Sequence, residues 1–103
     1  MSRTTFIVKC SDANQAAQVT ERILISEKYD RILENGETVW KCGNGLWAAI
    51  RYIKLEFPDP NTMHISGWVK ATIGGEMNLD GTYGGLPKKQ VSKVIKQIQT
   101  AIL

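Results

Sequence analysis

RYIKLEFPDPNTMHISGWVK, residues 51–70, carries the pattern that decides the fold. Apolar and polar residues alternate on both sides of the two prolines, which is typical of strands that bury one face. The segment 58–61 is expected to turn the chain, because Pro58 and Pro60 lack the N–H group that a sheet ladder needs. The stretch therefore predicts two long antiparallel strands that are neighbours in a sheet.

The same alternation assigns side chains to the two faces of these strands. Ile53, Leu55 and Phe57 are expected on the side that faces the core. Tyr52 and Trp68 are expected on the opposite side, since successive side chains of a strand point to opposite faces.

The segments before this pair predict a strand, a helix and a hairpin. Residues 5–11 mix β-branched and aromatic types, which predicts a strand. Small apolar residues at helical spacing predict a helix over 13–28, with Ser11 or Asp12 as its N-cap. Asn35-Gly36 predicts a type I′ turn, because both of its central positions need positive φ. Its two strands are expected at 30–34 and 37–42.

The segments after the pair predict a short edge strand at 76–80 and a final helix that starts at Pro87. The helix is expected to bury one apolar stripe and to keep every lysine off it. The stripe consists of Val91, Val94, Ile95, Ile98 and Ile102. The order β-α-β-β-β-β-(β)-α predicts an α+β fold, an antiparallel sheet of about five strands with two helices packed on one face.

Length and composition are those of one globular domain, residues 1–103. The chain has 43% hydrophobic and 22% charged residues, and its length supports a single core. No apolar run approaches the roughly 20 residues of a membrane-spanning helix. The first residues lack the apolar core of a secretory signal. A cytoplasmic domain without a membrane partner is expected.

The positive charge is concentrated at the end of the chain. The formal net charge is +3, yet residues 81–103 hold four lysines and no acid, whereas residues 1–80 hold nine basic and ten acidic side chains. The excess positive charge therefore belongs to the final helix.

GTYGGLPKKQ, residues 81–90, has two interpretations. Backbone N–H groups of a glycine-rich loop before a helix can bind an anion, which makes Gly84, Gly85, Lys88 and Lys89 a candidate anion site. The stretch does not match the GxxxxGK[ST] phosphate loop, however, and a plain entry into the helix explains it as well. Lysines in a first helical turn oppose the helix dipole at a cost of roughly 0.3–1 kcal/mol each, which a bound anion would reverse.

Trp40, Tyr52 and Trp68 form a candidate partner-binding surface on the sheet face that the helices leave uncovered. A protein partner or a second copy of the chain could pack against these rings. Alternatively, the rings fill the rim of the core or cover the second face. Nucleic acid is an unlikely partner, because the basic helix and the rings are expected on opposite sides and would not form one groove. Trp47 is expected in a loop.

No catalytic or metal-binding residue is predicted. His64 is the only histidine and has no carboxylate near it in sequence, whereas general acid–base catalysis needs a positioned base. Cys10 and Cys42 belong to no CxxC pair and are expected to be buried, reduced thiols. A domain without a cofactor or an enzymatic activity is expected.

Several segments together resemble a family of small uncharacterised bacterial domains. They are NGETVWKCGNG (35–45), RYIKLEF (51–57), MNLDGTYGGLPKKQ (77–90) and the closing amphipathic helix. The likeness runs over roughly residues 25–103 and is most distinctive at 79–89. The resemblance implies kinship at the level of the fold and transfers no activity, ligand or site residue.

These observations support two hypotheses about function. The first is a non-catalytic interaction or assembly module that meets a protein partner on the aromatic sheet face. The second is a binder of a small anionic ligand or an acidic partner, which uses the glycine loop and the basic C-terminal helix.

Overall fold

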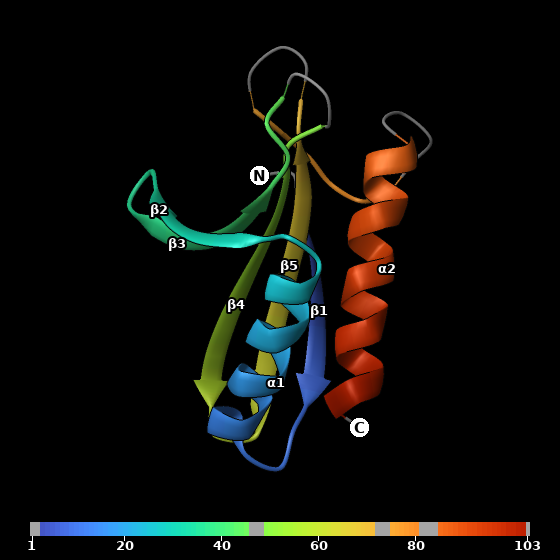
Figure 1. The fold of residues 1–103 in the computed structure, drawn as a ribbon. Helices are drawn as coiled ribbons and strands as arrows, with labels where there is room; N and C mark the ends of the chain where they lie inside the picture. The colour runs from blue at the N-terminus through green and yellow to red at the C-terminus, as the bar shows by residue number, and fades with distance from the viewer. Residues whose placement is uncertain (1–2, 46–48, 72–74, 81–84, 103) are drawn as a thin grey trace.

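The computed structural model describes residues 3–45, 49–71, 75–80 and 85–102. These residues form an α+β fold in the order β-α-β-β-β-β-β-α, as the sequence predicts (Figure 1). Its elements are β1 (Thr4–Lys9), α1 (Ala13–Ser26), β2 (Asp30–Glu34), β3 (Glu37–Cys42), β4 (Arg51–Asp59), β5 (Thr62–Lys70), β6 (Glu76–Met77) and α2 (Gly85–Ile102).

The strands form one antiparallel sheet in the order β1-β5-β4-β3-β2, and β6 pairs with the end of β5. The long strands β4 and β5 are neighbours, as the alternation over residues 51–70 predicts. Their register places Ile53 opposite Gly67 and Tyr52 opposite Trp68. Because paired residues share a face, Tyr52 and Trp68 lie on one side of the sheet and Ile53 lies on the other.

The turn between β4 and β5 is shorter than the prolines suggest. β4 continues through Pro58 to Asp59, and its register with β5 shifts between Glu56 and Asp59. Such an irregularity accommodates a proline within a strand, since the ladder is already interrupted there. The expectation that Phe57 faces the core is wrong, because the shift removes it from the regular alternation and leaves it 37% exposed.

Both helices cover the same face of the sheet (Figure 1). α2 packs on β4 and β5, and α1 packs on α2 and β5. The main core lies between these layers. Its fully buried members include Leu24 of α1, Ile53 and Ile65 of the sheet, and Ile95 and Ile98 of α2.

α1 starts where the sequence predicts and ends earlier. The Asp12 side chain accepts a hydrogen bond from the backbone N–H of Asn14 at 2.9 Å, which makes it the N-cap. The helix stops at Ser26 rather than at residue 28. Lys28 has a φ of 71°, and a residue in this left-handed region ends a helix.

α2 starts at Gly85, two residues before the predicted start, and buries the predicted stripe together with one lysine. Lys88 is only 6% exposed, and its ammonium group donates a hydrogen bond to the backbone oxygen of Asp80 at 2.6 Å. It precedes Val91 by three positions and therefore shares the buried face. The expectation that every lysine lies off this stripe is thus wrong for Lys88.

The Asn35-Gly36 turn joins β2 to β3 as predicted. Asn35 has a φ of 54° and Gly36 a φ of 79°, the positive values that a type I′ turn requires. The hairpin extends away from the helices (Figure 1). It places Glu34 and Glu37 opposite each other on either side of the turn.

Candidate functional site

Tyr52 and Trp68 lie on the helix-free face of the sheet, as the alternation predicts, and form one ring stack. Their centroids are 5.1 Å apart and their planes differ by 10°. Tyr52 is only 6% exposed and Trp68 only 3%. Both rings are therefore buried on the second face and do not form an open aromatic surface.

Cations close both ends of this stack. The guanidinium carbon of Arg3 lies 3.6 Å from the centroid of the Trp68 ring, and Nζ of Lys41 lies 5.7 Å from the centroid of Tyr52. Cations over ring faces are attracted by the ring quadrupole. The outer faces of both rings thus already have partners within the chain.

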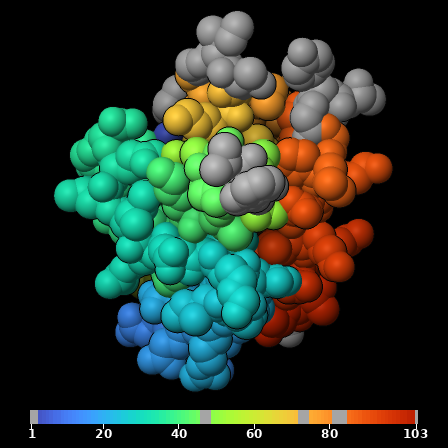
Figure 2. Space-filling model, turned by 45° about the horizontal axis from the view of Figure 1, so that its top comes forward, coloured from blue at the N-terminus to red at the C-terminus, as the bar shows by residue number. Residues whose placement is uncertain are grey.

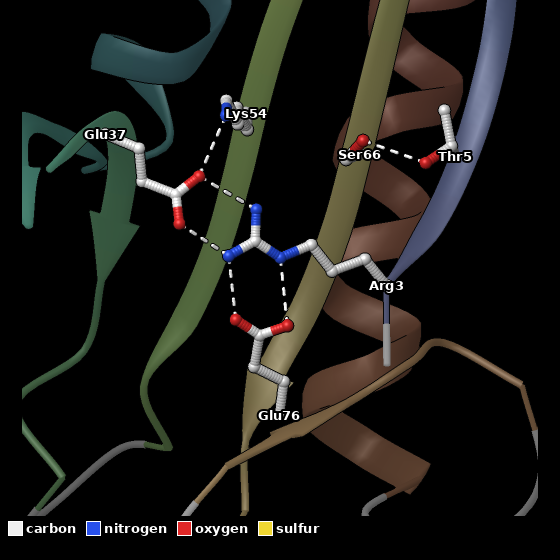
Figure 3. Close-up of polar contacts among 6 residues, drawn as sticks. All are labelled: Arg3, Thr5, Glu37, Lys54, Ser66 and Glu76. Carbon is white, nitrogen blue, oxygen red and sulfur yellow. Dashed lines mark hydrogen bonds and ion pairs between the residues drawn. The ribbon is translucent and has the colours of Figure 1, made fainter. Parts of the chain in front are cut away.

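Arg3 is held by two carboxylates (Figure 3). Its Nη1 and Nη2 donate to Glu37 at 2.9 and 2.7 Å, and its Nε and Nη2 donate to Glu76 at 2.9 and 2.7 Å. Lys54 adds a 2.8 Å ion pair to Glu37. The hydrogen bonds from Arg3 and Lys54 lower the pKa of Glu37 to about 2. The hydrogen bonds that Arg3 donates to Glu37 and Glu76 raise the pKa of Arg3.

A second charged group forms beside the stack at the hairpin. Lys41 and Glu34 make an ion pair at 3.1 Å, and the Tyr52 hydroxyl donates to Glu34. This hydrogen bond is the main cause that lowers the pKa of Glu34. Burial first, and then the bond to Glu34, raises the pKa of Tyr52, so its hydroxyl stays protonated at neutral pH.

A pocket of about 390 Å³ opens above these groups. Val39, Tyr52 and Trp68 contribute to its lining, and its charged lining residues are Arg3, Glu34, Glu37, Lys41, Lys70 and Glu76. Most of these charges are paired with one another. A ligand in this pocket would have to compete with ion pairs that the protein already makes. The pairs of Glu37 with Arg3 and Lys54 connect the hairpin to the rest of the sheet.

Trp40 does not lie on this surface, so the expectation that it joins Tyr52 and Trp68 there is wrong. It pairs with Ile53 and lies in the main core on the helix-facing side, 6% exposed. Its neighbour Lys41 pairs with Tyr52 and occupies the opposite face. The register between β3 and β4 decides which face Trp40 occupies, and the sequence of the hairpin does not reveal that register. Trp47 lies outside the described residues.

The exposed side of α2 carries a different kind of surface, the lysine face, defined here as Lys89, Lys93 and Lys96. All three side chains are exposed, and none has a hydrogen bond or ion pair with another described residue. They line a groove of about 480 Å³. Its other lining residues are Leu79, Gly85, Lys88 and Ser92, so no carboxylate among the described residues lines it. In Figure 2, α2 forms the orange and red edge opposite the teal and green hairpin.

The predicted anion site is thus only partly present on this surface. Lys89 is exposed on the groove, whereas Lys88 lines it with an ammonium group that already binds the Asp80 carbonyl. Gly85 is the first residue of α2. Gly84 lies outside the described residues. Sequence reasoning assigned no role to Lys93 and Lys96 individually, although their i+4 and i+7 spacing from Lys89 is the signal of a shared helix face.

No group of three histidine, cysteine or acidic side chains within the described residues could hold a metal ion. His64 lies half-buried in β5 on the helix-free face, and its register partners are Ile7 and Glu56.

Comparison with known proteins adds no relative, since no family model, no curated protein and no solved structure matches the chain. The resemblance to small bacterial domains therefore stays a prediction. Inferences about function depend on the geometry of the chain itself.

Neither of the two described helices combines the length and the apolar composition that crossing a bilayer requires.

Proposed function

We propose that the chain is a binding module that holds an anionic partner against the lysine face of α2. The observation that carries the proposal is the charge of this surface. Lys89, Lys93 and Lys96 follow one another at i, i+4 and i+7 on the exposed side of one helix, and no acid in residues 81–103 balances them.

This arrangement costs stability in the free protein. Like charges at i,i+4 and i,i+3 destabilise a helix by about 0.2–0.5 kcal/mol per pair. Lys89 also lies near the N-terminus of α2, where the helix dipole disfavours a cation. A negatively charged partner would relieve both costs, so its binding is favoured by the same charges that strain the unbound helix.

The chemistry of the face favours some anions over others. Lysine presents a compact, mobile charge, whereas arginine provides the planar fork that recognises bases and phosphates in two-point contacts. The aromatic stack lies on the other side of the sheet, so bases of a nucleic acid would find no ring to stack on beside the lysines. An acidic protein segment or a small phosphate-rich ligand fits this surface better than nucleic acid does.

The test compares two triple variants with the same change in net charge. Lys89→Gln/Lys93→Gln/Lys96→Gln removes the lysine face. Lys9→Gln/Arg22→Gln/Arg31→Gln removes three exposed cations elsewhere. Binding of poly-L-glutamate, inorganic polyphosphate and single-stranded DNA is measured by calorimetry at low and at physiological salt.

We expect the first variant to lose at least about tenfold in affinity for poly-L-glutamate or polyphosphate, and the second to bind nearly as the parent does. The affinity should fall as salt is added, because exposed charges are screened. Equal losses in both variants, or no binding of any probe by the parent, would contradict the proposal. A preference for DNA would assign the face to a different partner class.

The aromatic face remains a weaker candidate for a protein partner or for self-association. Both rings are buried, so a partner would meet the charged rim around Arg3 and the exposed side chain of Ile7 instead. Changing Trp68 to alanine would remove a buried ring and would alter folding before it altered binding. The accessible lysines therefore favour α2 as the binding surface.

A further inference from the structure

Arg51 is an unusual cation on the helix-facing side of the sheet. It begins β4 opposite Cys42 of β3. Its Nη1 donates to the Gln90 side chain and its Nη2 to Sγ of Cys42 at 3.1 Å, while its buried Nε has no partner among the described residues. No described carboxylate forms an ion pair with it. A partly buried guanidinium without a counter-ion favours a negative charge on the atom next to it.

Tyr29 supplies a second unsatisfied donor in the same region. Its side chain is 4% exposed, and its hydroxyl has no hydrogen-bond partner in the described part of the chain. Burial raises the pKa of Tyr29 and outweighs the opposing charge of Arg51, so the hydroxyl keeps its proton. A buried hydroxyl normally finds a partner, so the Tyr29 hydroxyl is a donor that can bind an acceptor atom formed beside it.

Cys42 lies in direct contact with Arg51 and shares the main core with Tyr29. Its Sγ receives the Arg51 contact and lies 3.8 Å from the backbone oxygen of Glu27, to which the thiol donates. Loss of the thiol proton would leave a thiolate directly beside a guanidinium. A guanidinium in direct contact stabilises negative charge on the sulfur as it attacks an oxidant.

We propose that Cys42 is an oxidation site, at which a small hydroperoxide converts the thiol to a sulfenic acid that Arg51 and Tyr29 hold. The inference is independent of the lysine face. The unsatisfied donors, Nε of Arg51 and the hydroxyl of Tyr29, provide hydrogen bonds for the oxygen atom that oxidation adds to Sγ.

The step balances with hydrogen peroxide as the only co-reactant. The Cys42 thiol gives its proton to solvent, and the thiolate sulfur attacks one peroxide oxygen. The S–O bond forms as the O–O bond breaks, and hydroxide leaves and takes up the proton as water. Sulfur is oxidised by two electrons and the peroxide is reduced by the same two.

Cys10 is an internal control for this reaction. It is more exposed than Cys42, and it is also a free thiol. Within the described part of the chain, only its backbone makes hydrogen bonds, with Asn61 as the partner, and no cation contacts its sulfur. If accessibility alone governed reactivity, Cys10 would react first.

The experiment uses the full chain with one cysteine at a time. Cys10→Ser keeps Cys42, and Cys42→Ser keeps Cys10. Each folded protein receives hydrogen peroxide and dimedone, and the sulfenic acid adduct is followed by intact mass at pH 7. We expect Cys42 to label at least about tenfold faster than Cys10, despite its lower exposure.

Two further variants in the Cys10→Ser background test the named partners. Arg51→Met should slow labelling about tenfold and Arg51→Lys should restore much of the rate, because the charge is what supports the thiolate. Tyr29→Phe, which deletes only the unpaired hydroxyl, should shorten the lifetime of the sulfenic acid. Far-ultraviolet circular dichroism checks that each variant is folded. Labelling of Cys42 that is no faster than that of Cys10, or that appears only in denaturant, would overturn the proposal.

Discussion

Arg3 is the residue on which the helix-free face most depends. Its guanidinium offers five N–H donors in a fixed plane, and here the plane covers Trp68 while its edges meet two carboxylates. The carboxylates come from β3 and β6, which lie 34 and 73 positions further along the chain. One side chain therefore ties the start of β1 to two distant strands.

Glu37→Gln tests the electrostatic part of this arrangement. The pKa of Glu37 is about 2 in the folded protein and about 4.3 in an unfolded chain. The carboxylate thus contributes stability that is fully present above about pH 4.3 and is lost as the pH falls towards 2. We expect the variant to be less stable than the parent by about 1–2 kcal/mol at pH 7.

The difference should shrink steadily between pH 4 and pH 2, as measured by urea unfolding at each pH. Arg22→Gln, an exposed change in α1 without a described side-chain hydrogen bond, serves as the control and should show no such trend. A stability difference that is the same at pH 7 and at pH 2.5 would contradict the electrostatic account.

At the scale of elements, the close approach of α2 to β5 depends on Gly67. A Cβ atom at this position would lie 2.9 Å from Cγ1 of Val91 and 2.9 Å from Cδ1 of Ile95. We expect Gly67→Ala to destabilise the protein by about 1–3 kcal/mol, because the core must shift to admit the methyl group. Urea unfolding measures the effect.

Gly85→Ala is the matched control, since a Cβ atom at Gly85 meets nothing within 4 Å and the residue is the first of α2. It should be neutral or slightly stabilising, because alanine favours helix over glycine. If both substitutions had the same effect, the contact between α2 and β5 would not be the cause.

The hairpin shows how one local turn serves the tertiary structure. The positive φ angles of Asn35 and Gly36 make the β2–β3 turn tight. Glu34 and Glu37 therefore flank it on one face, each facing a different cation of the ring stack. The element that the sequence predicts most directly thus also closes the second face.

At the scale of the whole molecule, positive charge is segregated onto α2. The acids and bases of the hairpin side pair with one another, whereas Lys89, Lys93 and Lys96 face solvent. Lys93→Glu reverses the central charge and turns two repulsive pairs into attractive ones. We expect it to raise the urea midpoint at low salt by an amount worth about 0.5–1 kcal/mol.

The gain should disappear near 1 M salt, where the screening length is only about 3 Å. The same variant should bind poly-L-glutamate more weakly than the parent. A variant that was both more stable and equally able to bind would separate the strain in α2 from the proposed function.

Much of this architecture could be predicted from local patterns. Alternation over residues 51–70 predicted the central strand pair, Asn35-Gly36 predicted the hairpin, and apolar spacing predicted both helices, because each signal depends on neighbours within a few positions. The opposite faces of Ile53 and Tyr52 also followed from the alternation. The functional roles assigned to the aromatic rings and the glycine loop stay predictions.

The face occupied by Trp40, the burial of Lys88 and the cover over Trp68 arose only in three dimensions. Each depends on a partner far away in the chain: the register between β3 and β4, the backbone at Asp80, and the carboxylates that hold Arg3. Local spacing predicts on which face of its own helix or strand a side chain lies. It contains no information about which distant group will meet that side chain, because packing and ion pairing are settled only when the elements come together.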